Sequence, residues 1–226
     1  MKEEIYLEED EVPSTTVMMS IGILVISFMV GFLFYFLIMD EVKERKKKHI
    51  ENILSLLINF IIYIWIGKIV LHIKLFMQDP LAVLAYPSDS RAFYLATILI
   101  IINIYYQTTK KQQEARTLFN TFVPVFIAAS FIFEFTQLVI YKNDHAWTTL
   151  LLWMFLLIGY ILAYEKWKSS LVNVIFFVSS LIILAILTLT KDTLTIFGYT
   201  VSPFYFISLL ILVFIIIVYS NKRKVS

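Results

Sequence analysis

The sequence predicts an all-α integral membrane protein with seven transmembrane helices. Hydrophobic residues make up 60% of the 226 residues and charged residues only 16%, whereas a soluble domain is closer to half apolar and a quarter charged. The apolar residues fall in blocks of about 20, the length that crosses the hydrocarbon core of a bilayer. Basic residues gather in alternate connections between these blocks, a pattern typical of multi-pass membrane proteins.

A single domain is expected over residues 1–226, beginning with an acidic extracytoplasmic tail at 1–15. A secretory signal begins with basic residues and has a shorter apolar stretch, so the first apolar block is interpreted as a retained span. The seven spans are expected approximately at residues 16–39, 51–75, 91–106, 118–141, 147–164, 171–190 and 202–219.

The distribution of basic residues predicts the orientation of the chain. Of the 19 lysines and arginines, 13 lie in the basic run Lys43–Lys48, the other connections on that side and the C-terminal tail. Only 4 lie in the connections and tail on the opposite side. Because the side richer in lysine and arginine faces the cytoplasm, we expect the N-terminus outside and the C-terminus inside.

The connection at 76–91 has a character of its own. It faces outward in this topology and includes the run DPLAVLAYPSDSR, which continues into the third span. Pro80 and Pro87 disfavour a continuous helix through it, and its aspartates and serines favour turns. The other segments are interpreted as a scaffold that positions this loop and the polar residues beneath it.

Ionisable residues inside the apolar blocks are the next signal, because such groups normally face the bundle interior and find partners. Lys68 and His72 lie one turn apart on the second span. A polar stripe follows one face of the fourth span: Ser130, Glu134, Gln137 and Tyr141. Lys68 and Glu134 lie at similar depth on spans of the same direction, so we predict that their charged groups approach each other.

Three interpretations of this pair stay open: a structural tie that neutralises two charges, a contact with a lipid headgroup or substrate, or a proton relay. His72 fits an interfacial or hydrogen-bonded histidine as well as a catalyst. Three asparagines are expected to hydrogen-bond between helices: Asn59, Asn103 and Asn173.

Composition excludes several classes of site. There is no cysteine, which excludes disulfides, thiolate nucleophiles and thiolate metal ligands. The three histidines lack metal-ligand spacing, and no glycine-rich phosphate loop or basic–aromatic nucleic-acid surface is present. We therefore expect no metal, no cofactor and no nucleic-acid partner.

The order of features resembles the prolipoprotein diacylglyceryl transferase family. HIENILSLLINFIIYIWIGKIV is similar to the family's second span, DPLAVLAYPSDSRAFYLA to the segment leading into its His-Gly-Gly motif, LFNTFVPVFIAASFIFEFTQ to its fourth span and FGYTVSPFYFISLLILV to the start of its last span. The resemblance implies seven spans, a bacterial plasma membrane location, and phospholipid and lipoprotein precursors as partners. Family members transfer diacylglycerol from phosphatidylglycerol to a lipoprotein cysteine.

The family's active-site signature is missing. Tyr94 stands in place of the histidine of His-Gly-Gly, and Glu134 and Gln137 replace the arginine and asparagine of Arg-x-Gly-Asn. The reaction needs cations around the lipid phosphate and a group that activates the incoming thiol. Glu134 reverses the charge beside that phosphate, so unmodified family chemistry is not expected.

Three functions remain as hypotheses. The first is a divergent, non-catalytic relative that binds a phospholipid or a lipoprotein acyl group, with headgroup contacts from Lys68, Glu134, Gln137 and Arg91. The second is a phosphatidylglycerol-dependent transferase with a rebuilt site, whose catalytic candidates are Tyr94, Glu134 and His72. The third is a small transporter or a membrane-complex subunit in which Lys68 and Glu134 act as gating charges.

Overall fold

The computed structural model describes residues 12–80, 83, 90–110, 114–142, 146–167, 170–190 and 194–225, with the backbone alone for 12–18, 20 and 216–225. The helices in these ranges are α1 (Val12–Ile38), α2 (Lys43–Leu71), α3 (Ile73–Gln78), α5 (Ser90–Lys110), α6 (Ala115–Tyr141), α7 (Ala146–Trp167), α8 (Ser170–Thr190) and α9 (Pro203–Val225). The predicted all-α membrane class is confirmed.

Within the described residues, six helices are long and apolar enough to cross a membrane: α1, α2, α5, α6, α7 and α8. The described apolar part of α9, Pro203–Ile215, is shorter. Each of these seven helices overlaps one of the expected spans. The second span differs most, because α2 begins eight residues before residue 51 and ends at Leu71, four residues before the expected end at 75. The count of seven spans and the sidedness of the termini stay predictions.

Helices extend into both the N-terminal tail expected at 1–15 and the connection expected at 76–91. α1 begins at Val12, inside the acidic tail expected at 1–15, whose first 11 residues lie outside the described residues. The loop expected at 76–91 begins within α3, and α5 starts at Ser90. Pro87 and its neighbours lie outside the described residues.

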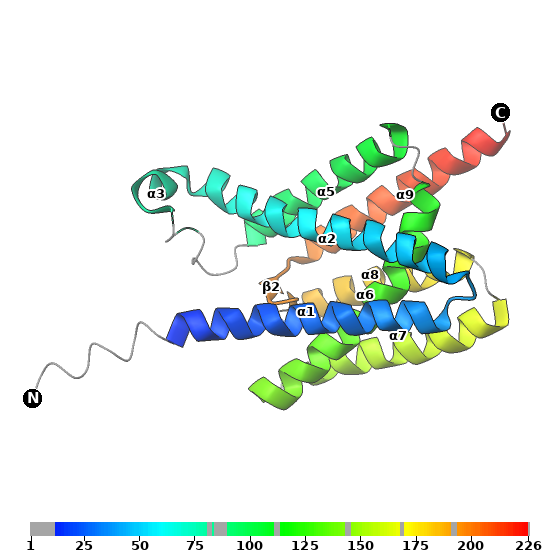
Figure 1. Cartoon of the computed structure of the whole chain (residues 1–226), viewed down its shortest axis with the longest axis horizontal. Coiled ribbons are helices and arrows are strands. Elements are labelled where there is room, and N and C mark those ends of the chain that lie inside the picture. Colours follow the sequence, from blue (N-terminus) through cyan, green and yellow to red (C-terminus); the bar gives the residue numbers. More distant parts are fainter. Residues whose placement is uncertain are drawn as a thin grey trace, which may run out of the picture.

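The long helices run back and forth through one elongated bundle (Figure 1). α1 begins at one end of it, and α9 ends at the opposite end (Figure 1). α6 packs against α1, α7, α2 and α8, whereas α5 packs mainly on α2 and α9 mainly on α8. α6 is therefore the central helix, in agreement with its having the highest buried share among the candidate spans.

Small residues let the helices approach closely at two contacts. A Cβ atom added at Gly31 of α1 would lie 2.6 Å from the carbonyl oxygen of Val125 on α6. A Cβ atom at Gly67 of α2 would lie 3.1 Å from the carbonyl oxygen of Ala92 on α5. These glycines set the spacing of the α1–α6 and α2–α5 pairs.

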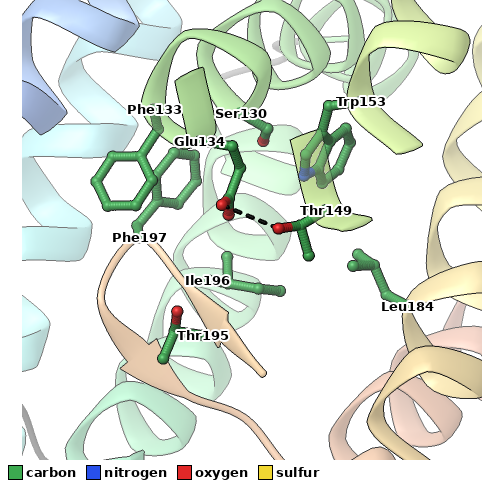
Figure 2. Close-up of a pocket in the computed structure, with 9 residues that line it drawn as sticks. All are labelled: Ser130, Phe133, Glu134, Thr149, Trp153, Leu184, Thr195, Ile196 and Phe197. Carbon is green, nitrogen blue, oxygen red and sulfur yellow. Dashed lines mark hydrogen bonds between the residues drawn. The ribbon is translucent and has the colours of Figure 1, made fainter. Parts of the chain in front are cut away.

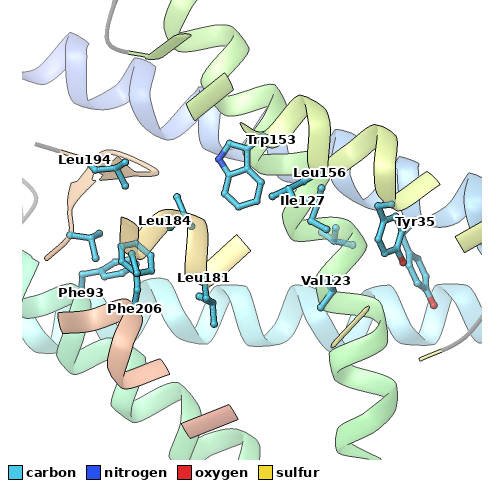
Figure 3. Packing of buried hydrophobic residues seen from close by; sticks show 14 of the residues in the cluster. Tyr35, Phe93, Val123, Ile127, Trp153, Leu156, Leu181, Leu184, Leu194 and Phe206 are labelled. Carbon is cyan, nitrogen blue, oxygen red and sulfur yellow. The ribbon is translucent and has the colours of Figure 1, made fainter. Parts of the chain in front are cut away.

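The core between the helices is rich in aromatic rings (Figure 3). Tyr35, Trp153 and Phe206, from α1, α7 and α9, are among its largest buried side chains. Large hydrophobic residues also cover the outer faces of the helices, as expected where lipid takes the place of water. Trp147 and Trp167, at the two ends of α7, are both exposed, which suits the aromatic belts of a bilayer.

The basic run that sequence analysis places between the first two spans belongs to the first turns of α2, which starts at Lys43. Lysine, arginine and glutamate are good helix formers, so the run continues the helix rather than forming a loop. Lys46 donates from Nζ to the carbonyl oxygen of Phe36 at 2.8 Å. This bond satisfies a carbonyl in the last turn of α1.

A short β-hairpin joins α8 to α9, where only a connection was expected. β1 (Thr195–Ile196) pairs antiparallel with β2 (Tyr199–Thr200). The turn residues Phe197 and Gly198 have φ angles of 49° and 85°, which fits a type I′ turn. A left-handed conformation is uncommon for a bulky residue. The ring of Phe197 packs against Phe28 of α1 and against Phe126 and Phe133 of α6, so the hairpin tip is inserted into the bundle.

Candidate functional site

A small cavity lies between α6, α7, α8 and the tip of the hairpin (Figure 2). Residues four positions apart lie on the same face of a helix. Ser130 and Glu134 of α6, and Thr149 and Trp153 of α7, therefore line the cavity in pairs. The complete lining is Ser130, Phe133, Glu134, Thr149, Trp153, Leu184, Thr195, Ile196 and Phe197. The space inside it is about 10 Å³, room for about one water molecule.

Oxygen atoms from two helices meet in this cavity. Thr149 Oγ1 lies 3.0 Å from Glu134 Oε2 and 3.0 Å from the carbonyl oxygen of Ala146. A threonine hydroxyl has one hydrogen, so Thr149 donates to only one of these acceptors at a time. Glu134 is 7% exposed and Ser130 is 4% exposed. The Ser130 Oγ atom has no hydrogen-bond partner within the described part of the chain.

Aromatic side chains share the cavity wall with Glu134. Phe133 and Phe197 lie edge to face with their ring centroids 5.2 Å apart, and both line the cavity. Figure 2 shows Phe197 at the hairpin tip, beside Phe133 and near Glu134. Glu134 was predicted because it is a charge within an apolar block, whereas Thr149 and the hairpin that completes the wall were not predicted.

Tyr94, a candidate catalytic residue, has a different environment. Its hydroxyl oxygen accepts a hydrogen bond from the backbone N–H of Ser202 at 2.9 Å. Its ring stacks on that of Tyr205, with centroids 5.1 Å apart. Tyr94 thus joins the first turns of α5 to the start of α9, and it is not among the residues that line the Glu134 cavity.

The other candidate residues lie near the ends of α2, α5 and α6. Lys68 is in the last turn of α2 and is 8% exposed. His72 stands at the break between α2 and α3, where its backbone N–H donates to the Lys68 carbonyl oxygen at 3.0 Å. Arg91 is exposed at the start of α5, and Gln137 is half-buried on α6. The approach of Lys68 to Glu134 stays a prediction.

A hydrogen-bonded chain of polar side chains links α6, α7 and α8. Tyr160 donates to Asn173 Oδ1 at 2.8 Å, and Asn173 Nδ2 donates to Asn120 Oδ1 at 3.0 Å. Ser170 also donates to Asn120 Oδ1, at 2.9 Å. The interhelical bond expected for Asn173 is confirmed, while its partners were not foreseen. Pro124, one turn after Asn120, has no N–H, which leaves the Asn120 carbonyl without its usual helical donor.

A second polar chain connects α1, α2 and α6. His49 Nδ1 lies 3.0 Å from the Tyr35 hydroxyl and 3.1 Å from Glu41 Oε2. Thr121 Oγ1 donates to the Tyr35 hydroxyl at 3.4 Å. These contacts were not predicted, because the partners of His49 lie on separate helices and follow no motif.

Asn103 confirms another expected contact between helices. Its Nδ2 donates to the Tyr63 hydroxyl on α2 at 2.7 Å, and Gln107 donates to its Oδ1 at 2.9 Å. This ladder ties α5 to α2 inside the membrane-spanning region. The corresponding expectation for Asn59 stays a prediction.

The candidate site offers hydroxyl and carboxylate oxygens, and it has no cluster of metal-binding side chains. No group of three or more histidine, cysteine or acidic residues able to hold a metal occurs among the described residues. Comparison with known proteins finds no matching family model, no matching curated sequence and no matching solved structure. The relation to prolipoprotein diacylglyceryl transferases therefore rests on the sequence segments quoted above and stays a prediction.

Proposed function

We propose that this chain is a lipid-handling membrane protein that binds an anionic phospholipid, or the acyl group of a lipoprotein, without catalysing diacylglyceryl transfer. The observation that carries the proposal is the junction of α2 and α5. Gly67 packs against Ala92 there, and the next residue on α2 and the previous residue on α5 are Lys68 and Arg91. Two cationic residues therefore lie on adjoining turns of packed helices.

Such a junction suits a phosphate group. Arginine and lysine form short, charge-assisted hydrogen bonds to phosphate oxygens. Lys68 is buried while Arg91 is exposed at the start of α5, so one cation lies inside the bundle and the other at its surface. The predicted topology puts this end of both helices at the outer leaflet. A lipid whose headgroup reaches the junction keeps its acyl chains along the apolar outer faces of the helices.

The surroundings of Tyr94 favour binding over transfer. This residue occupies the position of the family's histidine, yet its hydroxyl oxygen accepts the Ser202 N–H and its ring is stacked. A general base has to reach the proton that it removes. The Tyr94 hydroxyl instead holds the start of α9, and Glu134 faces a cavity with room for about one water.

Native mass spectrometry of the purified full-length chain tests the binding. We expect retained phosphatidylglycerol, and we expect the doubly substituted variant Lys68→Met, Arg91→Gln to lose at least half of it. Lys74→Gln, which removes an exposed lysine on α3, is the matched control and should retain lipid as the native chain does. Equal retention in all three proteins contradicts the proposed junction.

A transferase assay separates binding from catalysis. The purified protein is added to an extract that lacks the authentic transferase, together with phosphatidylglycerol and a lipobox peptide. The mass of the peptide is then measured. We expect no lipidated peptide. Product that disappears with Tyr94→Phe or Glu134→Gln would instead establish a rebuilt transferase site.

A second function, a small transporter or a membrane-complex subunit, is favoured by the Glu134 cavity. Its space is the size of one water molecule rather than of a lipid headgroup. Ionisable residues inside a membrane often mark ion or proton pathways. Uptake of a labelled ion into vesicles that contain the protein, compared with empty vesicles, distinguishes this function from lipid binding.

A further inference from the structure

One ring nitrogen of His49 lies within hydrogen-bond distance of two different partners. Its Nδ1 atom is 3.0 Å from the hydroxyl oxygen of Tyr35 and 3.1 Å from Glu41 Oε2. Tyr35 is buried on α1, at 2% exposure, whereas the side chain of Glu41 is 39% exposed in the turn of residues 39–42 that joins α1 to α2. His49 therefore connects the interior of the bundle to this α1–α2 turn.

The two partners require different states of the His49 Nδ1 atom. A carboxylate only accepts hydrogen bonds, so Glu41 bonds to Nδ1 when this nitrogen carries a hydrogen. A neutral imidazole with its hydrogen on Nε2 has a lone pair at Nδ1, which accepts the hydrogen of the Tyr35 hydroxyl and repels the Glu41 carboxylate. One nitrogen thus serves one partner or the other, and its protonation decides which.

We propose that His49 is a proton-operated switch, which bonds to Tyr35 when it is neutral and to Glu41 when it is protonated. Binding of a proton fastens the α1–α2 turn to α2, and loss of the proton releases the turn. Histidine is the side chain whose charge ordinarily changes between about pH 5 and 8. The inference does not depend on lipid binding, since His49 and Lys68 lie near opposite ends of α2.

The neutral state has a continuous chain of hydrogen bonds. Thr121 on α6 donates to the Tyr35 hydroxyl oxygen, and Tyr35 in turn donates to His49 Nδ1. Thr121 and Tyr35 are 1% and 2% exposed, and buried hydroxyl groups normally have hydrogen-bond partners. In this state the chain ties α1 to α2 and α6, while Glu41 makes no hydrogen bond to the imidazole.

The protonated state is satisfied by reversing this chain. Thr121 Oγ1 also lies 3.0 Å from the Thr117 carbonyl oxygen, so its hydrogen turns to that oxygen and its lone pair accepts the hydrogen of Tyr35. The Nδ1–H group of His49 then donates to Glu41, in a charge-assisted bond that is stronger than a bond between neutral groups. The exchange moves only hydrogen atoms and the Glu41 side chain, and both buried hydroxyl groups keep a partner.

Titratable groups reach His49 from several other parts of the fold. Tyr35 on α1 and Glu41 in the turn contact its ring directly. Tyr164 on α7 acts indirectly, because its hydroxyl interacts with that of Tyr35. The neighbouring side chain from α6 in the hydrogen-bonded chain is the neutral Thr121. Within the described part of the protein, Glu41 is therefore the charged group that contacts the ring from outside α2.

Two cationic residues precede His49 by about one turn on α2. Lys46 Nζ donates to the carbonyl oxygen of Phe36, and Arg45 is exposed. Arg45 also lines an open hollow at the α1–α2 turn together with Glu41. The Glu41 carboxylate therefore turns to Arg45 when the neutral ring releases it, which gives the switch a second arrangement with its own charge pairing.

A spin label on the α1–α2 turn tests the proposal. The chain contains no cysteine, and Val42, next to Glu41, is 62% exposed, so Val42→Cys carries a single nitroxide label. The mobility of this label on the full-length protein is measured by electron paramagnetic resonance between about pH 5 and 8. We expect a restricted label at low pH, an at least twofold shorter rotational correlation time at high pH, and one transition between them.

Variants of the labelled chain assign the transition to the switch. His49→Gln and Glu41→Gln should each abolish it, because the first removes the titrating ring and the second removes the carboxylate that the protonated ring binds. His72→Gln, at the other end of α2, and Glu44→Gln, which removes an exposed carboxylate in the first turn of α2, are the matched controls and should retain it. Tyr35→Phe should move the transition to higher pH, because the neutral ring loses its hydroxyl donor.

Nuclear magnetic resonance of ¹⁵N-histidine-labelled protein reports on the imidazole without the spin label. Nδ1 of His49 should carry a hydrogen at low pH and lack it at high pH. Three outcomes overturn the proposal. Constant mobility of the label in the Val42→Cys chain shows that the turn is not switched. A transition that survives in His49→Gln shows that another group titrates. A hydrogen on Nδ1 throughout the pH range shows that His49 never exchanges Glu41 for Tyr35.

Discussion

The hydroxyl oxygen of Tyr94 accepts a hydrogen bond from the backbone N–H of Ser202, across 2.9 Å, although the two residues are 108 positions apart in the chain. The contact fastens α5 to the segment between the hairpin and α9. At the other end of the hairpin, Phe197 is held against α1 and α6. The connection between α8 and α9 is therefore fixed both at its tip and at its base.

Tyr94→Phe should destabilise the fold. The substitution keeps the ring that stacks on Tyr205 and removes only the oxygen that accepts the Ser202 N–H. The bond is only part-buried, so its loss should cost about 1 kcal/mol, and we expect the Tm to fall by about 2–4 °C. Tyr105→Phe removes an exposed hydroxyl and serves as the control. If both variants have the same Tm as the native protein, the Tyr94 hydroxyl does not stabilise the fold.

Gly31→Ala should separate α1 from α6. The new methyl group would lie 2.6 Å from the Val125 carbonyl oxygen, a distance at which the backbone must move. Overpacking of this kind costs about 1–3 kcal/mol, more than the roughly 1 kcal/mol by which alanine exceeds glycine in helix propensity. We expect a lower Tm and earlier unfolding in denaturing detergent.

Gly22→Ala on the same helix provides the matched control. Nothing lies within 4 Å of the position of its added methyl group, so only the helix propensity changes, and its Tm should equal or exceed that of the native chain. A Gly31→Ala protein as stable as Gly22→Ala would mean that α1 and α6 are not in close contact at this point.

The bond between Tyr160 and Asn173 should contribute a measurable coupling energy. Both side chains are almost fully buried between α7 and α8. Hydrogen bonds between helices in membranes contribute about 0.6 kcal/mol on average and up to about 1.7 kcal/mol. A double-mutant cycle with Tyr160→Phe and Asn173→Ala should give a value in this range. Additive effects of the two substitutions would show that the bond contributes nothing.

Phe197→Gly should destabilise the protein even though glycine suits the left-handed turn. The substitution relieves strain of about 1–2 kcal/mol. It also removes ring contacts with Phe28, Phe126 and Phe133, each contributing about 0.5–1.5 kcal/mol in addition to the area that the ring buries. We expect a net loss of about 2 kcal/mol in an unfolding titration. Phe204→Ala, which removes a ring that is 79% exposed, should have less effect, and a stabilised Phe197→Gly protein would contradict the insertion of the tip.

The helices were predictable because each span repeats one signal over about 20 residues. The span expected at 118–141 corresponds to α6, Ala115–Tyr141, and the one at 171–190 to α8, Ser170–Thr190. The hairpin was missed because its strands are two residues long and its turn has Phe-Gly in place of the usual Asn-Gly. The β-branched and aromatic residues on both sides of that dipeptide were a weak signal for it.

The candidate site was predictable only in part. Glu134 stands out because a charge inside an apolar block must face the bundle interior. Thr149 carries no charge and follows no motif, so only the packing of α7 on α6 shows that it bonds to Glu134. Tyr94 was selected by its position in a family motif, and such a position does not reveal that the hydroxyl bonds to a backbone N–H more than 100 residues away.

Cysteine labelling tests the orientation that the basic residues predict. The chain contains no cysteine, so single substitutions give an unambiguous signal. Thr200→Cys and Glu114→Cys place thiols at exposed positions on sides predicted to be outside and inside, and neither removes a basic residue. A membrane-impermeant maleimide should label Thr200→Cys in intact cells and Glu114→Cys only after permeabilisation. The reverse pattern would show that the acidic tail and the Glu134 cavity lie toward the cytoplasmic side. The distribution of lysine and arginine would then not determine the orientation of this chain.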